Sequence, residues 1–388
     1  MLALLCPSIA LPRVASAAEG TAAVMAGTCP DAAIRAALDR RLPKSGADRL
    51  VPHGRVTAAV ARVRAERALS EARELYTRTD FSGCISLLSI SELELARSLA
   101  EPQPALRQRA HGLLARVTLW LGICQWASGE PQAAATSFVR SAQLPASPQP
   151  DPALLPPELV AAYRSAVAEP RTQVTCQLDA PLAARDVQVD GKGPTVANGD
   201  TITVPAGSHY LVLRVHCKGD PRCEALGGMR ALRLEATPDR CRIQVPAVHA
   251  APRLACVNAA EAADASFAAS VTREARARQT LIIAVSAGGS VNLRLHRGEA
   301  GAGFAHQLVS TPGKGETVAE IVGRSAPLLL GRAPGPVEPP PPPNGTDDDR
   351  WYRKWWVWAI AGGAAAIIIT SAAVVSARDD SVRVVFGP

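Results

Sequence analysis

The longest uncharged stretch of the sequence constrains the fold most. Residues 355–377 read WWVWAIAGGAAAIIITSAAVVSA and contain no charged side chain. A helix of this length, rising about 1.5 Å per residue, spans the hydrocarbon core of a bilayer. Trp355, Trp356 and Trp358 stand at its start beside basic residues, which is typical of an interfacial membrane anchor. We therefore expect one transmembrane helix over 355–377 and a short tail over 378–388.

The N-terminus resembles an export signal. Residues 1–17 hold a short apolar stretch that ends in Ala15, Ser16 and Ala17, the small residues after which a signal peptidase cuts. No Lys or Arg precedes the apolar stretch, so a plain Ala-rich segment is the alternative. With export, we expect a single-pass protein of a bacterial inner membrane with its ectodomain in the periplasm.

The cysteines favour an oxidising compartment. The chain has nine cysteines, and without Cys6 in the predicted signal an even number, eight, remains for pairing into disulfides. The alternative is a metal site built from His216 and neighbouring cysteines, but the sequence has no CxxC pair. We expect disulfides, with Cys217 joined to Cys223 or Cys241, and no metal or other cofactor. The disulfide candidates of the β-rich region are Cys176, Cys217, Cys223 and Cys241.

Residues 56–168 have helical periodicity, broken by short turn-forming stretches, and predict antiparallel helices. In VTLWLGICQWASGEPQAAATSFVRSAQL, small residues allow helices to approach closely, a glycine makes the turn and a phenylalanine fills the groove between helical pairs. This stretch resembles a tetratricopeptide repeat. The residues that carry the resemblance are Leu121, Gly122, Gly129, Ala134 and Phe138.

An earlier stretch, EARELYTRTDFSGCISLL, is similar to the same repeat, with Cys84 in place of the usual alanine. The other corresponding residues are Ala72, Leu75, Phe81 and Leu88. The resemblance implies a concave groove that binds peptides or protein surfaces. A generic helical bundle that uses small residues for packing is the alternative.

Residues 172–248 change to short alternating strands separated by turn residues, which predicts a small β-sandwich. Gly191 and Gly207 provide the positive φ angles that tight turns need. A strand ending in Asp190-Gly191, followed by a turn with Pro205, Gly207 and His209, resembles a PEGA-type domain, a bacterial surface β-module. We interpret His209 as a turn residue rather than a ligand.

Four further segments complete the predicted organisation. Residues 18–55 form a partly helical N-terminal segment, 256–331 a small α+β domain, and 332–350 a proline-rich stalk in polyproline II conformation. The expected fold class is therefore a multidomain α + β chain. It has N-terminal tetratricopeptide-like hairpins at 56–168, a PEGA-like sandwich at 172–248, the α+β domain and one C-terminal transmembrane helix.

The sequence shows no signature of catalysis. The common nucleophile, metalloprotease and phosphate-loop motifs are missing, and the seven histidines lie in different modules. The net charge of +7 comes from arginines scattered among acids, which argues against nucleic acid as a partner. We expect no enzyme, no catalytic residue and no cofactor.

These features predict a membrane-anchored scaffold or adaptor of the cell envelope. It would bind other envelope proteins through the helical groove and the β-module. The alternatives are a single-pass receptor that transmits an envelope signal and a protein that binds cell-wall glycan.

Overall fold

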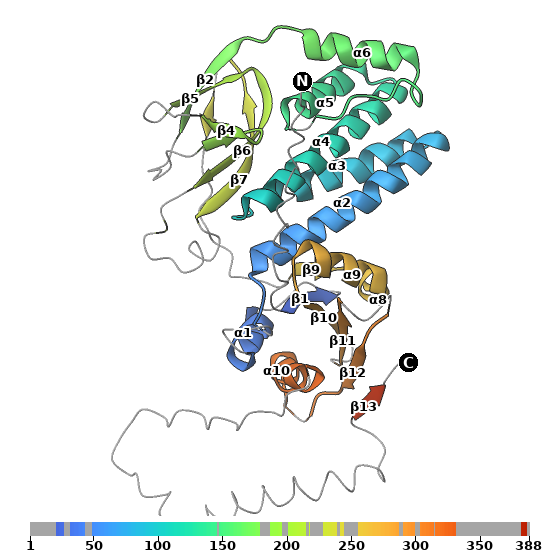
Figure 1. The fold of residues 1–388 in the computed structure, drawn as a ribbon, viewed down its shortest axis with the longest axis vertical. Coiled ribbons are helices and arrows are strands. Elements are labelled where there is room, and N and C mark those ends of the chain that lie inside the picture. Colours follow the sequence, from blue (N-terminus) through green and yellow to red (C-terminus); the bar gives the residue numbers. More distant parts are fainter. Residues whose placement is uncertain are drawn as a thin grey trace, which may run out of the picture.

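The computed structural model of the chain consists of a stack of helices, a two-sheet β unit beside the stack, and an α+β unit that contacts the first long helix (Figure 1). The structure describes residues 21–26, 32–42, 49–145, 147–178, 187–195, 201–214, 217, 228–238, 241–243, 255–286, 290–298, 303–313, 315–330 and 382–385.

The helical stack is built from antiparallel neighbours; short turns join the first four helices, and a longer segment leads to the last one. Asp80 accepts a hydrogen bond from Gly83 N at the start of the second helix, and prolines begin the next three helices. Gly129 makes its turn with a φ of 87°. The helices are α2 (His53–Thr77), α3 (Phe81–Ser98), α4 (Pro104–Ala127), α5 (Pro131–Gln143) and α6 (Pro157–Ala168).

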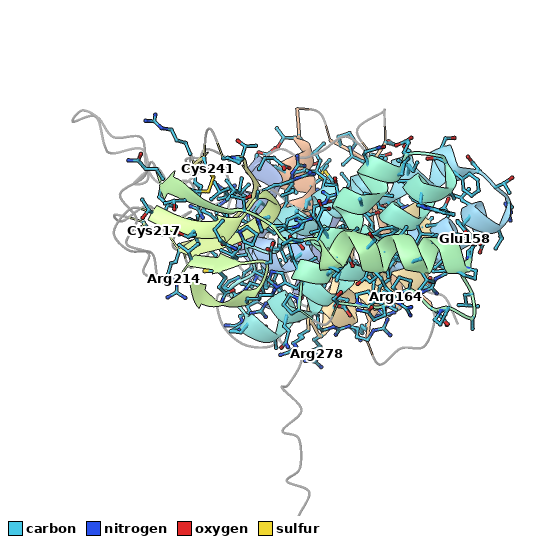
Figure 2. All side chains as sticks on the ribbon, turned by 90° about the horizontal axis from the view of Figure 1, so that it is seen from above. Glu158, Arg164, Arg214, Cys217, Cys241 and Arg278 are labelled. Carbon is cyan, nitrogen blue, oxygen red and sulfur yellow. A yellow bond between two sulfur atoms is a disulfide. The ribbon has the colours of Figure 1, made fainter. Side chains whose placement is uncertain are left out.

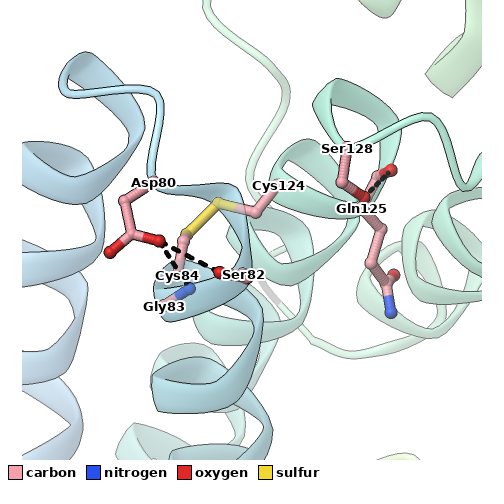
Figure 3. The surroundings of a disulfide bond; sticks show 7 residues. All are labelled: Asp80, Ser82, Gly83, Cys84, Cys124, Gln125 and Ser128. Atoms are coloured by element: carbon pink, nitrogen blue, oxygen red, sulfur yellow. Dashed lines mark hydrogen bonds between the residues drawn. A yellow bond between two sulfur atoms is a disulfide. The ribbon is translucent and has the colours of Figure 1, made fainter.

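A disulfide between Cys84 and Cys124 ties α3 to α4 inside the stack (Figure 3). Both sulfur-bearing side chains are fully buried and belong to the apolar core that runs from α2 through α4. The cross-link therefore joins the two predicted helical hairpins, α2–α3 and α4–α5, to each other.

The β unit packs two sheets over a shared apolar core. Its smaller sheet has β2 (Gln173–Leu178) between β5 (Thr201–Pro205) and β8 (Arg242–Ile243). Its larger sheet has the order β4 (Lys192–Thr195), β3 (Val187–Val189), β6 (Gly207–Arg214) and β7 (Met229–Ala236). Tyr210 and Val212 of β6 face the helices instead of the sandwich, so β6 is buried on both faces.

The α+β unit is discontinuous in sequence, unlike the expected order of consecutive domains. The N-terminal strand β1 (Thr21–Ala26) lies between β10 (Gln279–Val285) and β9 (Ala255–Val257), parallel to both. Residues of the expected separate segment 18–55 therefore form an inner strand of this sheet. The antiparallel strands β11 (Val291–Arg297), β12 (His306–Ser310) and β13 (Val382–Val385) complete it.

Helices cover both faces of this sheet (Figure 1). Alternate residues of β1 show why: Val24 packs with α8, α9 and the start of α2, whereas Ala23 and Met25 pack with α1 and α10. The bounds are α1 (Ala32–Arg41), α8 (Ala259–Ala263), α9 (Ala265–Glu274) and α10 (Val318–Leu329).

The expected fold class is wrong in its transmembrane helix. Among the described residues, no helix combines the length and the apolar character needed to cross a membrane. The helices α2 and α4 are long enough, but arginine and other charged side chains along them would be costly in hydrocarbon. The expected span 355–377, with Trp355, Trp356 and Trp358, lies outside the described residues, as do 1–17 and 332–350. What the structure describes is a mixed α+β fold.

Candidate protein-binding groove

A groove of about 500 Å³ runs between α2, α4 and the segment that connects α5 to α6. Its walls combine aromatic and aliphatic side chains with two arginines. Leu154 is the most exposed of the large apolar side chains there, at 73% exposure. The lining residues are Arg73, Tyr76, Thr77, Arg116, Leu119, Trp120, Ile123, Pro148, Gln149, Pro150, Asp151, Leu154 and Leu155.

The aromatic wall of the groove is held by ring contacts. Tyr76 of α2 meets the Trp120 ring of α4 edge-on, with the ring centroids 5.9 Å apart, and also contacts Phe81. The Arg73 guanidinium lies 5.4 Å from the Trp120 ring centroid in a cation–π contact. These contacts fix the two rings before any ligand arrives, which lowers the entropy cost of binding.

The segment between α5 and α6 forms the opposite wall. Gln149 donates a hydrogen bond to the hydroxyl of Tyr163 on α6, and buried Leu155 joins the core between α5 and α6. Asp151 accepts a hydrogen bond from Ala153 N and shapes the turn. Leu154 consequently stays exposed beside the buried Leu155 and does not pack into the core.

A second pocket of about 310 Å³ continues the groove toward the α+β unit. The two cavities share Arg116 and Pro148, so they form one continuous surface. The second pocket is markedly basic. It is lined by Arg62, Glu66, Arg109, Gly112, Leu113, Arg116 and Pro148.

Arg62 is the most buried of these arginines, with 2% of its side chain exposed. Its Nε donates to the Glu274 carboxylate at 3.0 Å, and its Nη2 donates to the Glu274 carbonyl at 3.0 Å. Burial lowers the pKa of Arg62, while the hydrogen bond to Glu274 opposes that shift. Arg109 donates to the other Glu274 oxygen at 2.7 Å, so two guanidinium groups share one carboxylate.

A buried polar cluster around Glu92 also connects the helices to the β unit. Arg140 of α5 donates to Glu92 of α3 at 2.5 Å, and the Tyr210 hydroxyl of β6 donates to the same carboxylate oxygen. Burial and the negative charge of Glu92 raise the pKa of Tyr210. The helical stack is therefore connected by buried polar contacts to both of its neighbours, through Glu92 on one side and Glu274 on the other.

The five predicted repeat residues all lie in the α4–α5 hairpin. Leu121, Ala134 and Phe138 are buried, and Phe138 meets the Tyr163 ring of α6 at 5.4 Å. A Cβ atom on Gly122 would lie 2.6 Å from the Phe138 ring, so this close approach requires glycine. These residues shape the stack and do not line the groove.

The predicted turn residues of the β unit come together in one hydrogen-bonded cluster. Asp190 accepts from His209 Nδ1 at 2.7 Å, and His209 Nε2 lies 2.7 Å from the Pro205 carbonyl. Asp190 and Gly191 both have positive φ, at 52° and 70°, and Gly207 has a φ of 133°. Asp190 and His209 are buried in this cluster, which holds the two turns together.

The structure shows the pairing of some of the predicted disulfide cysteines. Cys176 and Cys241 are joined, so Cys241 does not pair with Cys217. Cys217 is itself in a disulfide, as is Cys256, and Cys223 lies outside the described residues. Figure 2 shows Cys217 and Cys241 on the β side of the molecule, far from Arg164 on α6. Oxidised Cys217 and Cys241 cannot serve as the thiolate ligands of the alternative metal site.

The groove residues could not be predicted from the sequence. Tyr76 and Trp120 were available as aromatic signals on neighbouring helices, but their proximity depends on how α2 and α4 pack. Leu154 lies in a proline-rich connection with no periodicity, and nothing local marks it as part of a wall.

No protein-family model, curated protein or solved structure matches this chain. The resemblances to tetratricopeptide and PEGA families therefore stay predictions.

Proposed function

We propose that this protein is a scaffold or adaptor of the bacterial cell envelope that binds a segment of a partner protein in the groove between α2 and α4. The observation that carries the proposal is the exposed Leu154 facing a groove whose aromatic wall, Tyr76 and Trp120, is already ordered. Large apolar side chains left exposed in a concave site are typical of binding surfaces.

The chemistry of the groove supports binding over catalysis. Its polar side chains are two arginines, Arg73 and Arg116, together with Thr77, Gln149 and Asp151. Among these described lining residues, no nucleophile is hydrogen-bonded to a base, which is the arrangement that covalent catalysis uses. Aromatic and arginine side chains are instead the residue types enriched where proteins bind one another.

The disulfides support a periplasmic or otherwise extracytoplasmic location. The Cys84–Cys124 disulfide lies within the helical stack and the Cys176–Cys241 disulfide within the β unit. Cys217 and Cys256 are oxidised as well. Structural disulfides persist in secreted and periplasmic proteins and are rare in the cytosol.

A scaffold also needs a rigid frame, and the connections between units provide one. Glu274 of the α+β unit bonds to Arg62 and Arg109 of the helical stack, and Tyr210 of the β unit bonds to Glu92. Breaking such buried contacts leaves charges unpaired, so the units are expected to keep a fixed relation around the groove.

Selection of random peptides displayed on phage against the oxidised full-length chain tests this function. We expect enriched peptides, and binding that is weakened about tenfold or more when Leu154 is changed to Ser, because the variant loses apolar contact area. Leu328→Ser is the matched control, since Leu328 is also exposed, at 47%, but lies on α10. Failure to enrich any peptide, or equal weakening by both substitutions, would reject the groove as the binding site.

A further inference from the structure

The basic pocket contains a buried cationic donor without a partner. Nη1 of Arg62 is buried and has no hydrogen-bond partner among the described residues, although Nε and Nη2 are both bonded. Buried charged donors are normally paired, because an unpaired one has lost its hydration without compensation. Arg62 itself lines the pocket, and a hydrogen-bond acceptor is what this donor lacks.

The surrounding charges leave an excess of positive charge. Glu274 is the shared carboxylate partner of Arg62 and Arg109. Arg116 has no carboxylate partner among the described residues. Glu66 is the one acid among the described lining residues, and it is exposed.

A second buried acid, Glu101, does not cancel this excess. Glu101 acts on Arg62 through its charge, but it also faces Arg107, whose guanidinium donates to the Glu101 carbonyl. Among the described lining residues three arginines therefore stand against one acid, Glu66, and Arg116 has no carboxylate partner.

We propose that this pocket binds a carboxylate of the partner segment, held by Arg62 Nη1 and Arg116 while apolar side chains of the same segment lie against Tyr76, Trp120 and Leu154. This inference rests on the proposed function, because it assigns the chemistry of the ligand in the same groove. The shared residues Arg116 and Pro148 allow one extended chain to reach both cavities. A carboxylate matches the fork of guanidinium donors and supplies the missing acceptor.

Sequence analysis of the selected peptides is the first part of the test. The enriched peptides should carry a Glu or Asp close to apolar residues, and replacing that acid by its amide should weaken binding about tenfold. The affinity of the acidic peptide should also fall between about 50 mM and about 500 mM NaCl, while that of the amide peptide should change little.

Variants of the protein provide the second part. Arg116→Ala should weaken the acidic peptide about fivefold and leave the amide peptide nearly unchanged. Arg164→Ala, which removes an exposed arginine from α6 (Figure 2), is the matched control and should alter neither. Arg62→Lys keeps a positive charge near Glu274 but removes the guanidinium donors, so it should also weaken the acidic peptide, with folding checked by circular dichroism.

The outcomes separate the two proposals. Peptides that depend on Leu154 but carry no acid, or an acidic peptide bound equally by Arg116→Ala and Arg164→Ala, would overturn the carboxylate site and leave the groove intact. Absence of any peptide that depends on Leu154 would overturn the proposed function itself.

Discussion

The carboxylate of Asp190 joins two turns of the β unit by binding His209. One oxygen accepts from His209 Nδ1 at 2.7 Å, and the other accepts from Tyr210 N at 2.8 Å. His209 is 1% exposed, and its second nitrogen lies 2.7 Å from the Pro205 carbonyl. The turn between β3 and β4 is thereby fixed to the start of β6, the strand that packs against the helices.

Loss of the His209 side chain should destabilise the β unit. We expect His209→Ala to lower the free energy of unfolding by about 2 kcal/mol or more, because one oxygen of the Asp190 carboxylate is left buried without its partner. Chemical denaturation followed by circular dichroism measures the change. Thr203→Ala, on an exposed position of β5, is the control and should have a far smaller effect.

The contribution of His209 should depend on pH. Burial alone would lower its pKa, but the hydrogen bond and charge of Asp190 and the Pro205 carbonyl raise the pKa above its ordinary value. The stabilisation is then fully present below the unfolded pKa of about 6.5 and is lost as pH rises through the folded pKa. The stability difference between wild type and His209→Ala should therefore shrink at alkaline pH, and a difference that grows would contradict the assignment.

His111 on α4 should give stability the opposite pH dependence, a loss as pH falls. Burial, followed by the charge of Arg107, lowers the pKa of His111 from 6.5 to about 4. The unfolded chain then binds a proton between these values that the folded chain does not, so stability should fall by about 3 kcal/mol as pH drops from 6.5 to 4. His111→Gln should flatten this part of the pH profile in denaturant unfolding, and an unchanged slope would show that another group is responsible.

Two glycines of α4 offer a matched test of helix packing. A Cβ at Gly122 would lie 2.6 Å from the Phe138 ring and 3.2 Å from the Ala134 carbonyl, whereas one at Gly112 would have nothing within 4 Å. Gly122→Ala should cost about 1–3 kcal/mol through overpacking. Gly112→Ala should stabilise by up to about 1 kcal/mol, because alanine favours the helix. Thermal melts should shift the melting temperatures of the two variants in opposite directions. Shifts of the same sign would contradict this packing.

The sequence predicted what is encoded locally. Nearby residues determine the helix breaks near Asp80 and Gly129, the turn at Asp190-Gly191 and the change from helices to strands at residue 172. The structure places turns and strands at these positions. The α+β unit was less predictable. Its strand β1 pairs with β10, with Thr21 opposite Gln279, and only the folded chain reveals that register.

The binding groove depends on contacts that sequence patterns cannot show. Arg62 and Glu274 are separated by 212 positions, yet their ion pair sets the end of the basic pocket. On a helix with many arginines, Arg62 looks like any other solvated side chain. Its burial follows from α9 packing on α2, as does its unpartnered donor.

Amide hydrogen exchange of the full-length oxidised chain, with and without a selected acidic peptide, would locate the binding site. We expect slower exchange in residues 73–77, 116–123 and 148–155, which surround the groove, and no change in strand β6 or helix α10. Protection confined instead to the α3–β7 surface around Leu93 and Arg233, or absent from the groove at saturating peptide, would show that this groove is not the binding site.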